Sequence, residues 1–190
     1  MKKSLVLAGL VVASTSMMAM DTQYFVGFNV EKMSIDETAS WNDGMNEKFN
    51  LKDTGLNLKA GVILDKNHRL SLSHAKFSKD FIDLTLISGA YDYLIPINND
   101  FKLYAGLHAG NAKVEFQEDD SFSGLYYGGQ LGAIYNITKS LEFEAGLSYS
   151  KYNVERAGST IKEADGSTTE WAKEELDKST SMFAGINYKF

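Results

Sequence analysis

Three histidines and one pair of glutamates are the side chains best placed for acid–base or nucleophilic chemistry. A His–Ser pair on one strand face needs a hydroxyl two residues from the histidine. His74 is followed at that spacing by Lys76 and His108 by Gly110, while His68 falls in a short polar segment. A base without a positioned nucleophile is not a catalytic dyad, and the histidines lack the close spacing of a zinc site. The sequence therefore predicts no enzyme active site and a hydrogen-bonded, interior His108.

The two glutamates, Glu142 and Glu144, are two residues apart, so they share a strand face and resemble a carboxylate pair for acid–base work. We predict instead that they point into the narrow interior of a β-barrel, whose strands are described below, and pair with four cations there. Enclosed charges are unfavourable unless they are paired. The predicted partners are Lys59, Arg69, Lys102 and Lys189. A gated ion path through the same network is the alternative interpretation.

The elements that would position these side chains are eight segments in which apolar residues alternate with polar residues or glycines. Side chains two residues apart lie on one face of a strand, so each segment has an apolar and a polar face. The segments are 23–33, 56–64, 69–77, 81–95, 101–109, 125–137, 141–149 and 182–190. Two of them break the pattern: we expect a β-bulge near Ser88–Gly89, and a register slip or a position at a membrane interface for His74.

The face opposite the apolar one is rich in glycine, which distinguishes a membrane barrel from a soluble one. Small residues suit the crowded inside of an eight-stranded barrel, whereas a solvated outer surface has no need of them. Short polar turns alternate with longer connections at 34–48, 78–80, 117–121 and 157–178, as in outer-membrane barrels. The predicted fold class is all-β, an eight-stranded antiparallel up-and-down transmembrane β-barrel, in preference to a lipocalin-like barrel.

The N-terminus has the layout of a secretory signal, with two lysines before a short apolar run over 5–12. We expect cleavage after Ala19, or alternatively after Ser16, so that 1–19 is the signal peptide and 20–190 the barrel. No other segment offers the roughly 18 apolar residues of a membrane-spanning helix. The net charge of −6 argues against nucleic acid, and the lack of cysteine excludes disulfides. No cofactor is predicted.

The C-terminus ends on a strand pattern of alternating apolar residues that includes Ile186, Tyr188 and Phe190. This pattern resembles the terminal strand by which the outer-membrane assembly machinery recognises its barrels. Because it also has eight predicted strands, the chain resembles the OmpA/OmpX-like small barrels of the outer-membrane β-barrel domain family. The resemblance implies a bacterial outer-membrane location, Ile186, Tyr188 and Phe190 as an assembly signal, and lipids and lipopolysaccharide as surroundings. We do not expect the peptidoglycan-binding domain that outer-membrane protein A carries after its barrel.

The longer connections are acidic, and 34–48, 117–121 and 157–178 each carry a net charge of −3. Trp41 and Trp171 lie in the first and last of them, which barrel closure makes neighbours, so both are candidate ligand contacts beside Asp43, Glu170 and Glu174. Ser167 and Glu170 also have the spacing of a helix capping box. The predicted function is a non-enzymatic, surface-exposed barrel with adhesion or ligand binding through acidic extracellular loops. The alternatives are a small or gated pore and a lipid A-modifying enzyme.

Overall fold

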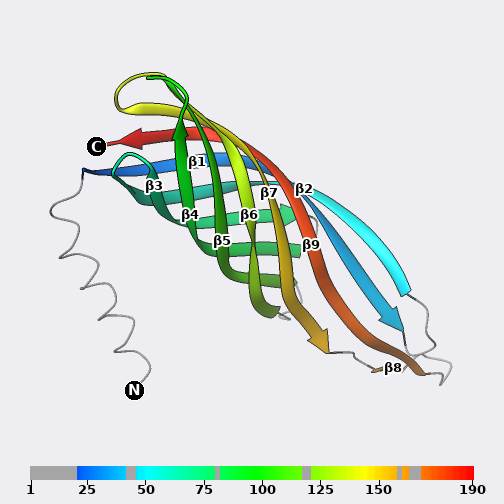
Figure 1. The fold of residues 1–190 in the computed structure, drawn as a ribbon. Helices are drawn as coiled ribbons and strands as arrows, with labels where there is room; N and C mark the ends of the chain where they lie inside the picture. The colour runs from blue at the N-terminus through cyan, green and yellow to red at the C-terminus, as the bar shows by residue number, and fades with distance from the viewer. Residues whose placement is uncertain (1–20, 42–45, 80–81, 117–120, 158–159, 163–167) are drawn as a thin grey trace, which may run out of the picture.

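The computed structural model describes residues 21–41, 46–79, 82–116, 121–157, 160–162 and 168–190, and these form a closed antiparallel barrel (Figure 1). Each strand from β1 to β7 pairs with the next, β7 pairs with β9, and β9 pairs with β1. The strands are β1 (Thr22–Trp41), β2 (Asn46–Leu64), β3 (His68–Lys79), β4 (Ile82–Pro96), β5 (Phe101–Phe116), β6 (Ser121–Asn136), β7 (Leu141–Ala157), β8 (Thr160–Lys162) and β9 (Thr168–Lys189). Because β8 pairs only with β9, eight strands make the wall, and the predicted fold class is confirmed.

The alternating pattern sorts side chains between the two faces of the wall as predicted. The apolar residues of the pattern point outward, and Leu58 and Leu131, for example, are about 60% exposed. Most of the described glycines point inward, where space is short: a Cβ added at Gly106 would overlap the Asp92 carboxylate, and one at Gly61 would meet the Phe25 ring. Among the described residues, no helix is long and apolar enough to cross a membrane.

The bulge predicted near Ser88–Gly89 is wrong, because β4 pairs with β3 and β5 in one unbroken register. The apolar side chains of Leu84 and Leu86 are instead buried inside the barrel, while Ile87 on the opposite face is exposed. In this part of β4 the apolar side chains of the pattern point inward and not outward, because the lumen itself is apolar at this level. Of the two alternatives for His74, the register slip is wrong, because the register of β3 is continuous there and His74 lies on the outer face. The position at a membrane interface stays a prediction.

The barrel wall is much taller on the side formed by β1, β2, β7 and β9, and we call the part that extends past the other strands the tall wall. β9 has 22 residues and β3 only 12, and Figure 1 shows β1, β2, β7 and β9 running together beyond the ends of the other strands. Most of the predicted loop over 34–48 is therefore strand. The helix suggested by the capping-box spacing is also wrong, because Thr168–Lys189 is β9. At the other end the chain reverses in tight turns, one of which places Asp65 and Lys66 at positive φ.

Candidate functional site

The lumen contains a buried ion cluster built on Glu144 of β7. The guanidinium of Arg69 on β3 donates through Nη1 and Nη2 to its carboxylate at 3.0 and 3.1 Å. Arg69 also donates through Nε to Asp92 Oδ2 on β4 at 2.9 Å. Lys59 Nζ on β2 contacts Glu144, and Asn187 Nδ2 on β9 donates to the same carboxylate at 2.7 Å.

The geometry of this cluster follows from its place in the fold. Each member lies on the inward face of a different strand, so the side chains meet across the narrow lumen. The Arg69 guanidinium also lies over the Tyr104 ring, 4.5 Å from its centroid, a cation–π arrangement that stabilises a desolvated cation. A bidentate arginine–carboxylate pair fixes both groups in direction as well as distance. The cluster therefore cross-links strands on opposite sides of the barrel.

A second, smaller ion cluster lies around Glu142, nearer the turns. Lys189 Nζ is 2.8 Å and Lys102 Nζ 3.5 Å from Glu142 Oε1. Lys189 also donates to Asn136 Oδ1 at 3.3 Å. The structure thus places all six residues of the predicted charge network on the inner face and gives each at least one partner of opposite charge.

Sequence reasoning missed several members of this polar layer. Asp92 was not among the predicted members, although the bulge predicted near Ser88–Gly89 would have put it on the polar face. β4 places it inside without a bulge, on the same face as the buried Leu84 and Leu86. Gln130 donates to Asp92 Oδ1 at 2.6 Å, and Asn57 donates to the buried Glu31 at 3.1 Å. These long-range partners lie on different strands, and their pairing depends on barrel register that no local pattern supplies.

A polar cavity of about 60 Å³ lies beside the Glu144 cluster. Its walls include Glu31, Lys59, Arg69, His108 and Ser150. His108 Nε2 and Ser150 Oγ are 2.8 Å apart, so His108 is interior and hydrogen-bonded, as predicted. Its hydroxyl partner is not two residues away on the same strand but comes from β7, 42 residues away. Nδ1 of His108 has no hydrogen-bond partner in the described part of the chain, so no described group orients the imidazole as a base.

Above the cavity, toward the longer connections, the lumen is apolar. The cluster comes from strand ends on that side and consists of Met33, Ile35, Ala75, Phe77, Leu84, Leu86, Ala112, Val114, Tyr126, Tyr152, Val154 and Leu176. Phe77 and Val154 are almost fully buried. The Tyr152 hydroxyl is 2.9 Å from Ser179 Oγ, so the tyrosine joins the apolar layer to the polar one below. We call this set the apolar layer.

The family model of the outer membrane protein beta-barrel domain matches residues 6–190. The chain belongs to this family. It is therefore a bacterial outer-membrane barrel, its exposed apolar belt faces lipid, and its surroundings are the lipids and lipopolysaccharide of that membrane.

Solved structures show the same fold. The outer membrane protein OprG of Pseudomonas aeruginosa has a TM-score of 0.62 at 17% identity, covering 90% of this chain and 97% of that chain. Outer membrane protein H of P. aeruginosa has a TM-score of 0.57 at 25% identity, covering 88% and 99%. The attachment invasion locus protein of Yersinia pestis, solved with the heparin analogue sucrose octasulfate, has a TM-score of 0.51 at 18% identity, covering 90% and 99%. No curated protein matches the sequence.

The other residues singled out from the sequence are placed as follows. Phe190 lies on the lipid-facing side at the turn end, stacked with Tyr24 and Tyr188 at centroid distances of 6.3 and 6.5 Å. Trp41 and Trp171 are cross-strand partners in β1 and β9, so they lie in strands and not in loops. Asp43 lies outside the described residues. His68 begins β3, and its Nδ1 is 2.8 Å from the Tyr91 hydroxyl.

Proposed function

We propose that this protein is a non-enzymatic structural barrel that binds an extracellular ligand through its tall wall. The observation that carries the proposal is the extension of β1, β2, β7 and β9 past the rest of the barrel (Figure 1). An outer-membrane barrel needs strands of only about 9–11 residues to span the bilayer, whereas β9 has 22. The surplus length presents a sheet surface outside the membrane.

The lumen supports this proposal over the alternatives of a pore or an enzyme. Paired charges occupy the lower part of the barrel, and the apolar layer occupies the upper part. The His108–Ser150 pair opens on a cavity of about 60 Å³, room for a few water molecules and far below the 300–1,000 Å³ of typical ligand sites. It also lies inside the barrel, whereas lipid substrates surround the outside.

The chemistry of the tall wall favours a cationic or sugar-like ligand. Segments 34–48 and 157–178, which include the far ends of β1 and β9, each carry −3. A negative surface attracts cations and repels polyanions, so this wall suits a partner opposite in charge to the heparin analogue seen with the Yersinia protein. The cross-strand pairing of Trp41 with Trp171 brings two aromatic residues to the same place, and aromatic rings beside carboxylates favour cations.

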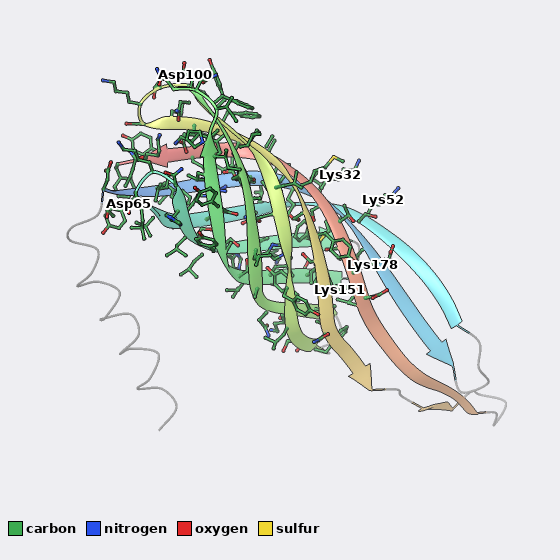
Figure 2. The ribbon with its side chains drawn as sticks, in the orientation of Figure 1. Lys32, Lys52, Asp65, Asp100, Lys151 and Lys178 are labelled. Carbon is green, nitrogen blue, oxygen red and sulfur yellow. The ribbon has the colours of Figure 1, made fainter. Side chains whose placement is uncertain are left out.

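Tryptophan fluorescence of the refolded barrel provides the test, because both tryptophans of the chain lie in the wall. We expect cationic peptides or glycans to shift the emission. The variant Glu170→Gln with Glu174→Gln should weaken the response several-fold. The control Asp65→Asn with Asp100→Asn removes the same charge at the turn end (Figure 2) and should leave it unchanged. If no titrant shifts the emission, and Trp41→Phe with Trp171→Phe leaves binding of whole cells intact, the proposal fails.

We further propose that Ile186, Tyr188 and Phe190 form the assembly signal and that residues 1–19 are a cleaved signal peptide. The Phe190 N–H donates to Tyr24 O at 3.0 Å, and the Phe190 carbonyl oxygen accepts from the Tyr24 N–H at 3.3 Å, so Phe190 takes part in the pairing with β1 that closes the barrel. Deleting Phe190 should lower the outer-membrane amount of the protein much more than deleting Gly166 in the last connection. Equal insertion of the two variants would refute the signal, and the mass of the mature protein reports the cleavage site.

A further inference from the structure

Four outward-facing lysines lie on the tall side of the barrel: Lys32 on β1, Lys52 on β2, Lys151 on β7 and Lys178 on β9. We call them the lysine patch. All four are exposed, and Figure 2 shows them in a band across these neighbouring strands, far from Asp65 and Asp100 at the turn end. Lipid-facing apolar side chains such as Met182 and Leu147 lie below them on the same strands.

The height of the patch places it at the membrane surface. Lys178 and Tyr188 share the outer face of β9 and are ten residues apart. At about 3.3 Å per residue and a tilt of about 40°, that separation spans roughly 25 Å, the height of the apolar band of an outer-membrane barrel. Tyr188 lies at the turn-side interface, so the patch lies at the opposite one, where the headgroups of the outer leaflet begin.

The described residues balance the charges of the patch only in part. Lys151 and Lys178 are direct cross-strand partners, and like charges in that position destabilise a sheet. Asp36 contacts Lys178 at 3.6 Å, and exposed Asp177 precedes it in the chain. In the described part of the chain neither Lys32 nor Lys151 forms an ion pair. An anion bound between the strands would remove the repulsion.

The short side of the barrel shows the contrast at a similar height. There, outward-facing Lys76 pairs with Asp83 at 2.9 Å and Lys113 with Glu115 at 2.7 Å. Each of these lysines has a carboxylate from its own barrel. The two lysines that have no carboxylate partner among the described residues, Lys32 and Lys151, thus both lie on the tall side, and a general attraction to an anionic membrane would not require that arrangement.

We propose that the lysine patch binds the phosphate groups of lipid A, the phosphorylated glycolipid that anchors lipopolysaccharide in the outer leaflet. Lysine is a well-suited phosphate ligand because its ammonium acts as a point charge with three donors. The outward-facing Thr180, a partner of both Tyr149 and Ser34 in the barrel, adds a hydroxyl beside the ammonium groups. The acyl chains of the lipid would lie along the apolar belt below. This role is independent of the ligand proposed for the tall wall.

Binding of fluorescent lipopolysaccharide to the refolded barrel in phosphatidylcholine nanodiscs tests the proposal. Each lysine near an anionic surface contributes about a fivefold change in affinity. Lys32→Gln with Lys151→Gln should therefore weaken binding about 25-fold, and Lys32→Arg with Lys151→Arg should restore most of it. The control Lys76→Gln with Lys113→Gln removes the same charge from paired lysines and should change affinity less than twofold.

Three further probes identify the source of the phosphate. Dephosphorylated lipopolysaccharide should bind the wild-type barrel as weakly as the glutamine variant binds the native lipid, and neither phosphatidylglycerol nor inorganic phosphate should compete. Heat-modifiable gel mobility shows whether each variant is folded. If the double variant does not fold, the single variant Lys151→Gln replaces it in the binding measurement. Equal losses in patch and control variants, no loss in the patch variant, or full competition by phosphatidylglycerol would overturn the proposal.

Discussion

The inner and outer faces of the same wall carry similar charged residues under opposite conditions. Inside, Arg69 and Lys189 each have a carboxylate within 3.0 Å. Outside, Lys32 and Lys151 have none among the described residues. A buried charge must be balanced by the chain itself, because its desolvation is otherwise too unfavourable, whereas a surface charge can be balanced by solvent or a ligand. We therefore expect a charged residue inside this barrel to affect stability, and a lysine without a carboxylate partner on its outer surface to affect ligand binding.

The largest effect expected from this comparison is at Glu144. Glu144→Gln leaves Lys59 and Arg69 with one carboxylate fewer inside the barrel, and it should lower the free energy of unfolding by about 3–5 kcal/mol. The matched change on the outer face, Glu115→Gln, breaks an exposed pair and should lower it by less than about 1 kcal/mol. Urea unfolding in lipid vesicles measures both. Equal losses would show that the interior network does not hold the strands together.

A smaller difference is expected for apolar side chains. Phe77→Ala would leave a cavity in the apolar layer, at a loss of about 3 kcal/mol in the free energy of unfolding. Leu72→Ala on the outer face removes a side chain that is 72% exposed, and because lipid chains are as apolar as leucine and refill the space, it should lose less than about 1 kcal/mol. The same unfolding assay compares them, and a larger loss for Leu72→Ala would contradict the inside–outside assignment.

The sequence predicted the strands of the barrel wall better than the contacts inside the lumen. Which face Leu58 or Leu131 occupies follows from two-residue alternation, a local property, and the strands were found from it. The contact between His108 and Ser150, 42 residues apart, depends on how strands β5, β6 and β7 align. Leu84 and Leu86 misled the interpretation because an apolar lumen and a lipid-facing surface look alike in sequence.

The smallest expected effect concerns that same pair. Ser150→Ala would leave His108 Nε2 without its partner inside the barrel, and it should lower the free energy of unfolding by about 1–2 kcal/mol. Its neighbour on the outer face, Lys151→Gln, should change stability by less than about 0.5 kcal/mol, as surface substitutions usually do. A stability loss at Lys151 as large as that at Ser150 would mean that the lysine is structural and not part of a ligand site.

The central claim is that the lumen is a filled, structural interior, so that the protein acts through its outer surfaces. Single-channel recording of the refolded wild-type barrel in a planar bilayer tests it most directly, with an open porin as the positive control. The paired charges around Glu142 and Glu144 and the apolar layer above them predict a flat baseline with no resolved conductance steps. Reproducible open steps from the wild-type barrel would contradict the claim and favour a pore.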